Sequence, residues 1–347
     1  AIDNYSGSAF NFGAVHCLLK YTDKELLVGT DNGLYLFDQN TNTFQRADNP
    51  ADPRSLSDQT INGMMWDAEG ALWVLTNLGG INYMSKQTKR FDYYSPAYLS
   101  GVPGAGEVVA PFCENKDGNI WIGTQSGLYF FNVATRELSP YAIGTKNQKY
   151  DIRSLMLDGD YLWIGTYAGG IRVINLRTGA VKAYTHSRGI PNTICSNDVL
   201  CIYKGRKGEI YVGTSWGLCR YDAARDNFMT ITSVGSMVSV VDIYEDMYNH
   251  LWIATSNSGV FSYNTMNAHW KHYQHEREDS TTITSNSVIT LFEDTKGTMW
   301  FGTNGGGLCS FDAKEKRFIE FDPHNTLLPN KVIYAIEQDQ GGDFWVS

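Results

Sequence analysis

The chain contains no hydrophobic run that approaches the roughly 20 residues of a membrane-spanning helix, and no signal peptide is visible. It is also poor in positive charge, because 28 lysines and arginines stand against 37 aspartates and glutamates, which gives a net charge of −9. Nucleic acid and anionic membrane surfaces both require a basic footprint. The charge balance therefore argues against either of them as the default partner.

Cysteine is rare, with six residues in 347, and their spacing matches neither a CxxC metal site nor a dense disulfide framework. Cys219 and Cys309 occupy the same position in two sequence repeats, each directly after Gly-Leu. Cys17, Cys113 and Cys201 fall in another kind of predicted strand. Small buried apolar residues are distributed in this way. We therefore expect the cysteines to be free and buried, so that they do not decide the cellular compartment.

Aromatic residues and glycine, by contrast, are abundant: aromatic residues make up 13% of the chain, and 34 residues are glycine. This mixture favours many strands joined by tight turns. A segment of the type WIGTxxGL recurs along the chain. Its clearest copies begin at Ile120, Leu162, Ile210, Leu251 and Met299, and weaker copies begin at Leu26 and Leu72.

The residues at the tryptophan position of the copies recur every 41 to 48 residues, and they are Leu27, Trp73, Trp121, Trp163, Tyr211, Trp252, Trp300 and Trp345. A period near 45 residues is typical of four-stranded propeller blades or of arrays of helical hairpins. The local pattern excludes helices, because short β-branched and aromatic runs end at Gly, Asn and Asp without an apolar period of 3.6 residues. Seven full repeats fit, and an eighth begins near the last residue.

We therefore predict an all-β fold, a β-propeller of four-stranded antiparallel blades with seven blades, or eight in the alternative. Residues 1–330 hold the seven repeats, and residues 331–347 supply the first two strands of a further repeat, either closing strands or the start of a second propeller. A glycine recurs at the centre of the second strand, which predicts that a bulky side chain of a neighbouring blade packs there. These glycines are Gly29, Gly123, Gly165, Gly213 and Gly302, and the first strands are predicted over residues 199–203, 240–245, 288–293 and 332–337.

The repeat unit resembles the NxxWIGTxxGLxxFD unit of the two-component regulator propeller family, and the resemblance covers nearly the whole chain. It implies the periplasmic sensor region of a hybrid two-component regulator of Bacteroidetes, in which the propeller binds an oligosaccharide released from a glycan and signals to a histidine kinase. In such proteins two propellers precede the membrane helix and the kinase, whereas this chain holds about one propeller. The fragment is therefore expected to be non-catalytic, within a parent histidine kinase tethered to the inner membrane.

Topology selects a face for the ligand, because the turns between second and third strands emerge at the same edge as the connectors that lead into the first strands. Amide, hydroxyl and aromatic groups at this edge suit sugars, whose C–H faces stack on rings while their hydroxyls need donors and acceptors. Arg153 offers a clamp for an acidic sugar, or an ordinary ion pair with Asp151 or Asp158. The predicted ligand-binding residues are Trp216, Tyr167, Arg153, Asn32, Asn257, Asn304, Asp198, Asn286 and Lys331.

Other chemistry finds less support. The pairs Glu245–Asp246 and Glu293–Asp294 recur at the turn between first and second strands, which indicates turn-forming side chains instead of a catalytic pair. The histidines of HWKHYQH (269–275) do not share one strand face, so no metal site is predicted, and no cofactor is expected.

The expected partners are an oligosaccharide ligand and, in the full-length protein, a second copy of the chain. No contact of this domain with nucleic acid is expected. Two alternatives to a sensor remain: a structural propeller that relays dimer geometry while the ligand site lies elsewhere, and a propeller glycosidase or lyase.

Overall fold

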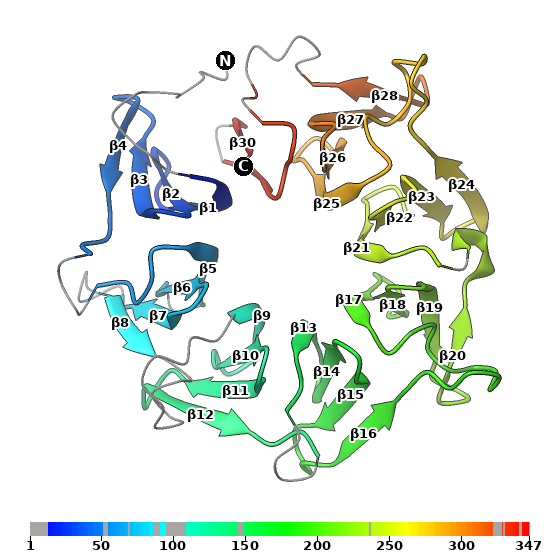
Figure 1. The fold of residues 1–347 in the computed structure, drawn as a ribbon, viewed down its shortest axis with the longest axis horizontal. Helices are drawn as coiled ribbons and strands as arrows, with labels where there is room; N and C mark the ends of the chain where they lie inside the picture. The colour runs from blue at the N-terminus through cyan, green and yellow to red at the C-terminus, as the bar shows by residue number, and fades with distance from the viewer. Residues whose placement is uncertain are drawn as a thin grey trace. The chain divides into compact units, whose positions relative to one another are not determined.

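The structure, a computed structural model, describes residues 13–50, 55–68, 70–85, 91–94, 109–144, 149–235, 237–321, 328, 330–339 and 342–346. Within these residues one helical element occurs, the 3-10 turn η1 (Thr232–Val234), and all other regular structure is strand. Seven four-stranded antiparallel sheets follow one another along the chain (Figure 1). The predicted all-β, seven-bladed β-propeller fold is therefore confirmed. None of the described residues belongs to a helix long and apolar enough to cross a membrane.

Contacts divide the chain into two units, which are described separately. The N-terminal unit comprises residues 13–164 and 172–182, and the C-terminal unit comprises residues 165–171 and 183–346, within the described ranges. We name the strands of each blade a to d in chain order. Each strand pairs only with its neighbours in the sequence, so every blade is a meander with strands a and d at opposite sides of the sheet.

The N-terminal unit contains blades 1 to 3, and blade 4 is shared between the two units. Blade 1 consists of β1 (Val15–Lys20), β2 (Glu25–Thr30), β3 (Gly33–Asp38) and β4 (Thr43–Arg46). Blade 2 consists of β5 (Ile61–Trp66), β6 (Leu72–Thr76), β7 (Gly80–Met84) and β8 (Phe91–Tyr94). Blade 3 consists of β9 (Val109–Glu114), β10 (Ile120–Thr124), β11 (Gly127–Asn132) and β12 (Glu137–Tyr141), and blade 4 of β13 (Ile152–Asp158), β14 (Tyr161–Thr166), β15 (Gly170–Asn175) and β16 (Val181–Tyr184).

The C-terminal unit contains blades 5 to 7, whose a strands β17, β21 and β25 lie side by side (Figure 1). Blade 5 consists of β17 (Val199–Lys204), β18 (Ile210–Thr214), β19 (Gly217–Asp222) and β20 (Asn227–Thr230). Blade 6 consists of β21 (Val240–Glu245), β22 (His250–Thr255), β23 (Val260–Asn264) and β24 (His269–Tyr273). Blade 7 consists of β25 (Val288–Glu293), β26 (Met299–Thr303), β27 (Leu308–Asp312) and β28 (Arg317–Glu320).

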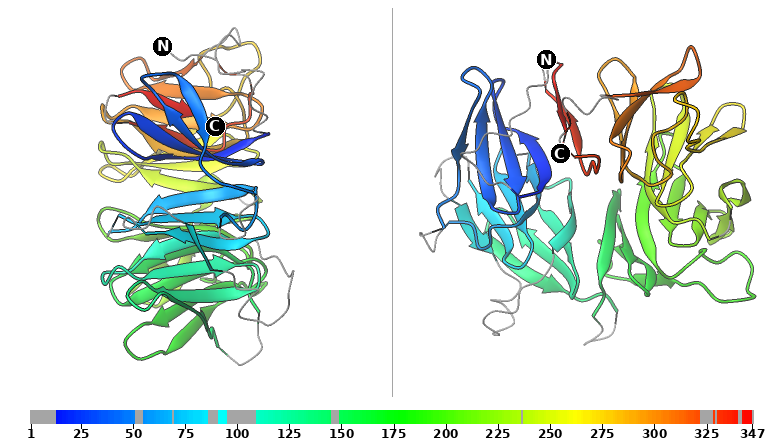
Figure 2. Two further views of the ribbon diagram at one scale, coloured as in Figure 1. Left: turned by 90° about the vertical axis from the view of Figure 1, so that its left-hand side faces the viewer. Right: turned by 45° about the horizontal axis from the view of Figure 1, so that its top comes forward.

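Large aromatic side chains fill the space between consecutive blades. In the N-terminal unit, Trp73 of blade 2 is 1% exposed and packs edge-on against Phe131 of blade 3, with 4.4 Å between the ring centroids. Figure 2 shows blades 1 to 3, coloured blue to cyan, with their sheets stacked face to face. Both faces of a b strand are therefore buried, which is why strands such as β10 read as continuous apolar runs.

The recurring glycine of strand b lies against the a strand of the next blade, as its spacing predicts. A Cβ at Gly123 would lie 2.5 Å from Cγ2 of Ile152 in β13, and a Cβ at Gly302 would lie 2.8 Å from Cγ2 of Ile333, which precedes β29 (Ile336–Gln338). Blade 2 has Leu75 at this position and balances it with Gly63, its partner in strand a. The exchange keeps the volume between strands constant, so the departure from the glycine rule leaves the blade intact.

The last described residues form a two-stranded antiparallel sheet from β29 (Ile336–Gln338) and β30 (Phe344–Val346). The strand predicted over residues 332–337 is therefore wrong at its start. Val332 forms an isolated bridge with Asn304, and the Ile333 amide donates to the Thr303 carbonyl at 2.9 Å. Residues 332 and 333 pair with blade 7, and the ladder to β30 begins only at Ile336. The division of the chain at residue 330 stays a prediction.

Candidate ligand-binding edge

The threonine that ends each b strand builds the turn that follows it. In all seven blades this threonine is fully buried. Its hydroxyl donates to the carbonyl of the glycine that opens or precedes strand c, as in Thr214 to Gly217 at 2.9 Å and Thr303 to Gly307 at 2.7 Å. The same Oγ1 often accepts an amide of the turn, such as that of Trp216. Each b–c turn therefore has a fixed backbone from which outward side chains project.

In the C-terminal unit, backbone hydrogen bonds tie these turns to the residues that lead into the a strands. Ser215 donates to Asp198, Ser256 to Ser239 and Asn304 to Ser287, at 2.8 to 3.0 Å. We call the resulting surface the turn edge. It comprises the b–c turn residues 167–169, 215–216, 256–258 and 304–306 together with residues 197–198, 239, 286–287 and 330–331.

Two aromatic side chains project from the turn edge. Trp216 is 59% exposed and Tyr167 is 56% exposed, although both belong to large hydrophobic types. The Trp216 amide is held by Thr214, so the ring stands on an anchored backbone. Aromatic rings held outside the blade cores contribute little to blade packing and offer apolar faces to a ligand.

The other predicted residues of the turn edge differ in how far their side chains are available. Asn257 and Asn304 are exposed, and the Lys331 ammonium lies 3.8 Å from a Glu320 carboxylate oxygen. Asn286 has a structural role, because its Oδ1 accepts the His275 amide at 2.8 Å and so holds the connector into blade 7. Asp198 is half-buried and its carbonyl accepts the Ser215 amide. Exposure therefore favours Asn257 and Asn304 over Asn286 as ligand contacts.

Asn32 and Arg153 belong to the N-terminal unit. The amide of Asn32 donates to Thr30 Oγ1 at 3.0 Å, so Asn32 holds the b–c turn of blade 1 as its counterparts do elsewhere. The Arg153 guanidinium pairs with Asp151 at 2.7 Å, which is the ordinary ion pair that the sequence offered as its alternative role. Arg153 remains 44% exposed, and such a surface pair contributes little to stability.

A disulfide joins Cys195 to Cys219, which corrects the expectation that all six cysteines are free. Cys195 lies in the connector that leads into blade 5, and this connector folds back over β19, where Cys219 is fully buried. The two Cα atoms are 6.4 Å apart. Burial raises the pKa of the free thiols of Cys17 and Cys113 to about 12, so neither is a nucleophile at neutral pH. Cys219 and Cys309 occupy the same position in the repeat, but only Cys219 has another cysteine beside it. The repeat pattern alone therefore could not predict the disulfide.

The recurring Glu-Asp pairs lie at the opposite side of the blades and hold turns, as predicted. One oxygen of Asp294 accepts the backbone amides of Lys296 and Thr298, and the other accepts the Trp300 indole N–H at 3.0 Å. Burial acts to raise the pKa of Asp294, but these hydrogen bonds outweigh it and lower the pKa below its ordinary value. The carboxylate is therefore a permanent acceptor with no proton to offer to a substrate.

The glutamates of the same pairs reach the preceding blade, which the sequence analysis missed. Glu245 accepts the Arg206 amide at 2.6 Å, and Glu293 accepts the Met247 amide at 2.8 Å. Both glutamates thus bridge successive a–b turns. Among the described residues, no group of three histidine, cysteine or carboxylate side chains is placed to hold a metal ion.

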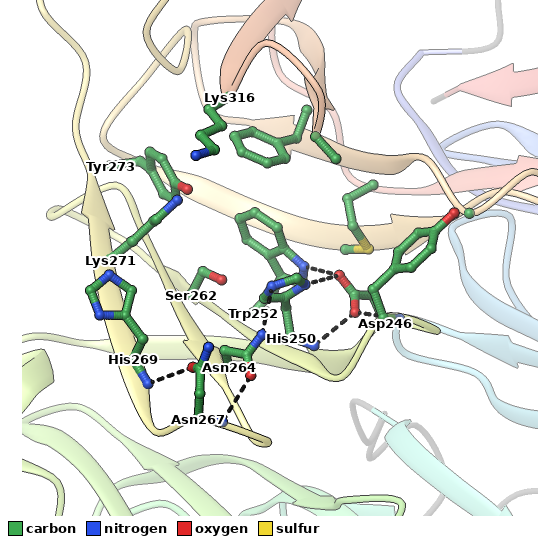
Figure 3. A pocket seen from close by; sticks show the side chains of 15 residues that line it. Asp246, His250, Trp252, Ser262, Asn264, Asn267, His269, Lys271, Tyr273 and Lys316 are labelled. Carbon is green, nitrogen blue, oxygen red and sulfur yellow. Dashed lines mark hydrogen bonds and ion pairs between the residues drawn. The ribbon is translucent and has the colours of Figure 1, made fainter.

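A cavity of about 380 Å³, which was not predicted from the sequence, lies between blades 6 and 7 on the side of the a–b and c–d turns (Figure 3). Its lining includes His269, Lys271 and Tyr273, which alternate along β24 and so share one face of that strand. The alternation was visible in HWKHYQH, where only a metal site was considered.

Seven four-stranded blades, each with a WIGT-type b strand and a threonine-closed turn, define the chain as a repeat propeller. Two segments, residues 234–257 and 282–305, match the two-component regulator propeller family. The likeness to this repeat family is thus shown for one segment in blade 6 and one in blade 7.

One curated relative is Histidine kinase P4 of Formosa agariphila, which is 36% identical over 72 residues, or 18% of this chain and 5% of that protein. Among solved structures, the extracellular domain of a putative one-component system of B. thetaiotaomicron is 20% identical, with a TM-score of 0.50 over 99% of this chain and 46% of that one. PorZ of Porphyromonas gingivalis, an essential surface component of the type-IX secretion system, is 16% identical, with a TM-score of 0.62 over 88% of this chain and 48% of that one. The chain thus spans about half the length of these solved structures, and the likeness to them concerns the fold.

Proposed function

We propose that the chain is the sensor propeller of a two-component regulator, that it lies outside the cytoplasmic membrane, and that it signals to a histidine kinase elsewhere in a longer protein. The repeat family of residues 234–257 and 282–305 supports this proposal. So does the 72-residue segment that is 36% identical to a histidine kinase. The fold of a solved extracellular domain, which matches 99% of this chain, is consistent with it.

The disulfide supports the same location on independent grounds. Disulfides persist in oxidising compartments such as the periplasm and the cell surface, and they are rare in the cytosol. The Cys195–Cys219 bridge holds a connector next to the turn edge. A structural disulfide of this kind suits a domain that folds outside the cytoplasm.

The ligand proposed for this sensor is an oligosaccharide released from a glycan, bound at the turn edge. The observation that carries the proposal is the exposure of Trp216 and Tyr167, which project from the b–c turns of consecutive blades. Sugar rings stack their C–H faces on such side chains, and the exposed amides of Asn257 and Asn304 on the b–c turns of blades 6 and 7 can pair with hydroxyl groups.

A thermal-shift screen of the 347-residue chain against glycan oligosaccharides tests the proposal. A ligand at 100 times its dissociation constant stabilises the native state by about 2.7 kcal/mol, which gives a readable rise in melting temperature. Trp216→Ala and Tyr167→Ala should each weaken the binding by about tenfold, because each removes one stacking surface.

Tyr161→Ala is the matched control. Tyr161 is 48% exposed and is the first residue of β14, whereas Tyr167 directly follows the last residue of the same strand. This variant should bind as the parent does. Equal affinity of the parent and the Trp216 variant would refute the site. If no saccharide raises the melting temperature, the ligand proposal fails and a structural relay becomes the better account. Release of shorter sugars from the ligand would instead indicate a glycosidase or lyase.

A further inference from the structure

The cavity between blades 6 and 7 lies within the C-terminal unit and away from the turn edge, because a–b and c–d turns surround it. Its volume of about 380 Å³ falls in the range of small-molecule sites. Trp252 and Met299 form a buried floor, while Lys271 and Lys316 are exposed at the mouth. The cavity therefore opens to solvent above an apolar floor (Figure 3).

The strand c residue that pairs with the tryptophan of strand b differs from blade to blade, and it is a serine in blades 6 and 7. In blade 2, Tyr83 pairs in register with Trp73 and stands edge-on against it, with 4.9 Å between the ring centroids. Blade 3 has a phenylalanine in the same register. In blade 6 the corresponding partner of Trp252 is Ser262. Strand c of blade 6 therefore provides no ring against the Trp252 indole, which instead contacts the rings of Tyr273, Phe301 and Phe311.

Two hydroxyl groups that face the cavity form no hydrogen bond within the described part of the chain. Ser262 is only 4% exposed, yet its hydroxyl makes no hydrogen bond with any described residue. Burial raises the pKa of Tyr273 to about 12, and its hydroxyl likewise has no partner among the described residues. A buried polar group without a partner costs free energy that a bound ligand or water recovers.

Two lysines place positive charge at the mouth of the cavity. Within the described part of the chain, the ammonium groups of Lys271 and Lys316 form no ion pair or hydrogen bond, and Figure 3 shows both on the same side of the cavity as the Tyr273 hydroxyl. Asp246 is the one carboxylate among the described lining residues. Its Oδ1 accepts two turn amides and its Oδ2 accepts the Trp252 indole N–H at 2.8 Å. That carboxylate is thus occupied, and the open groups are cations and hydroxyls.

We propose that this cavity is a second binding site, which takes a small organic anion whose carboxylate is attached to a six-membered ring. The ring packs against Trp252, the carboxylate lies between Lys271 and Lys316, and a polar ring substituent or a water reaches Ser262. Charge-assisted hydrogen bonds and ring contacts together select this chemistry. The site includes no residue of the turn edge, so a test of this site is independent of a test of the proposed oligosaccharide site.

Calorimetric titration of the 347-residue chain with matched probes tests the proposal. D-Glucuronate is compared with D-glucose, and benzoate with benzyl alcohol, so that a saccharide source and an aromatic source are separated. At least one acid should bind about tenfold or more tightly than its neutral counterpart, because a hydrogen bond to a charged group is worth more than one to a neutral group. Failure of both acids to bind, or equal binding of acid and neutral probe, would overturn the proposal.

Variants locate the binding. The double variant K271Q/K316Q should lose the preference for the acid, while Lys314→Gln, on the same turn between β27 and β28, should retain it. Ser262→Tyr should block both probes by filling the cavity, and Tyr83 in blade 2 shows that the position accepts this side chain. Unaltered acid binding in both K271Q/K316Q and Ser262→Tyr would place the anion elsewhere and refute the site.

Discussion

Removal of the Cys195–Cys219 disulfide should destabilise blade 5 and loosen the turn edge beside it. The bridge joins the connector into blade 5 to strand β19, across 24 positions of sequence. Next to it, the hydroxyls of Ser196 and Ser215 lie 3.0 Å apart, and the Ser215 amide donates to the Asp198 carbonyl. The disulfide is therefore the covalent part of the linkage that positions the turn carrying Trp216.

The expected loss follows from the length of the closed loop. Freeing a loop of this length restores conformational entropy to the unfolded chain, which lowers the free energy of unfolding by about 3.5 kcal/mol at 25 °C. Replacing the cysteines also removes the fully buried sulfur of Cys219, and this adds about 1 kcal/mol. The double variant Cys195→Ala/Cys219→Ala should therefore lose roughly 4 to 5 kcal/mol.

Urea unfolding provides the assay, and Cys309→Ala provides the matched control. Cys309 holds the position of Cys219 in blade 7, is equally buried, and is free. Its replacement should cost only the packing contribution, so the difference between the two variants isolates the cross-link. Alkylation of the unfolded, unreduced chain should label four thiols, and all six after reduction. Six labelled thiols before reduction, or equal urea midpoints for the two variants, would refute the reasoning.

Three further substitutions test the packing rules, each by urea unfolding. Asn115→Asp should raise the free energy of unfolding by about 1 kcal/mol, because the new oxygen can accept the buried indole N–H of Trp121, which has no partner in the structure; an unchanged midpoint would contradict this. Gly213→Ala should lower it by about 1 to 3 kcal/mol, since the added Cβ would lie 2.7 Å from Val240 Cγ1, and a neutral effect would disprove the close approach. Burial raises the pKa of Asp242 from 3.8 to about 6, so its ionisation costs folded-state free energy that is fully felt above pH 6 and absent below pH 4. Asp242→Asn should therefore gain stability relative to the parent between pH 4 and pH 7, by up to about 3 kcal/mol, and a pH-independent difference would exclude this.

The blade itself could be predicted from the sequence, because its hydrogen bonds join residues that are close in the chain. The Thr214 hydroxyl bonds to a carbonyl three residues away, and Asp294 bonds to amides two and four residues away. Such local hydrogen bonds recur wherever the sequence motif recurs. The glycine of strand b extended the prediction to the next blade, since only close packing explains a glycine at a strand centre.

The candidate site was predictable only in part. The exposure of Trp216 and Tyr167 agrees with their place in b–c turns, since side chains at a two- or three-residue turn have no neighbouring blade to cover them. The amide of Asn286 looked equally available in sequence, yet its oxygen holds the His275 backbone eleven residues earlier. A connector's side chain can turn outward or inward, and its composition does not distinguish the two.

The sequence by itself determined the period, the strand pairing within each blade and the turns, because these rest on contacts between residues a few positions apart. Only the tertiary structure decided which cysteine meets which, and where a cavity opens. Cys219 and Cys309 are equivalent in the repeat, but Cys195 faces only one of them. Ser262 cannot be told from other strand residues by its sequence, and only the structure shows that it pairs with Trp252. Such features depend on side chains brought together from different strands and connectors, and these side chains differ from blade to blade even where the repeat does not.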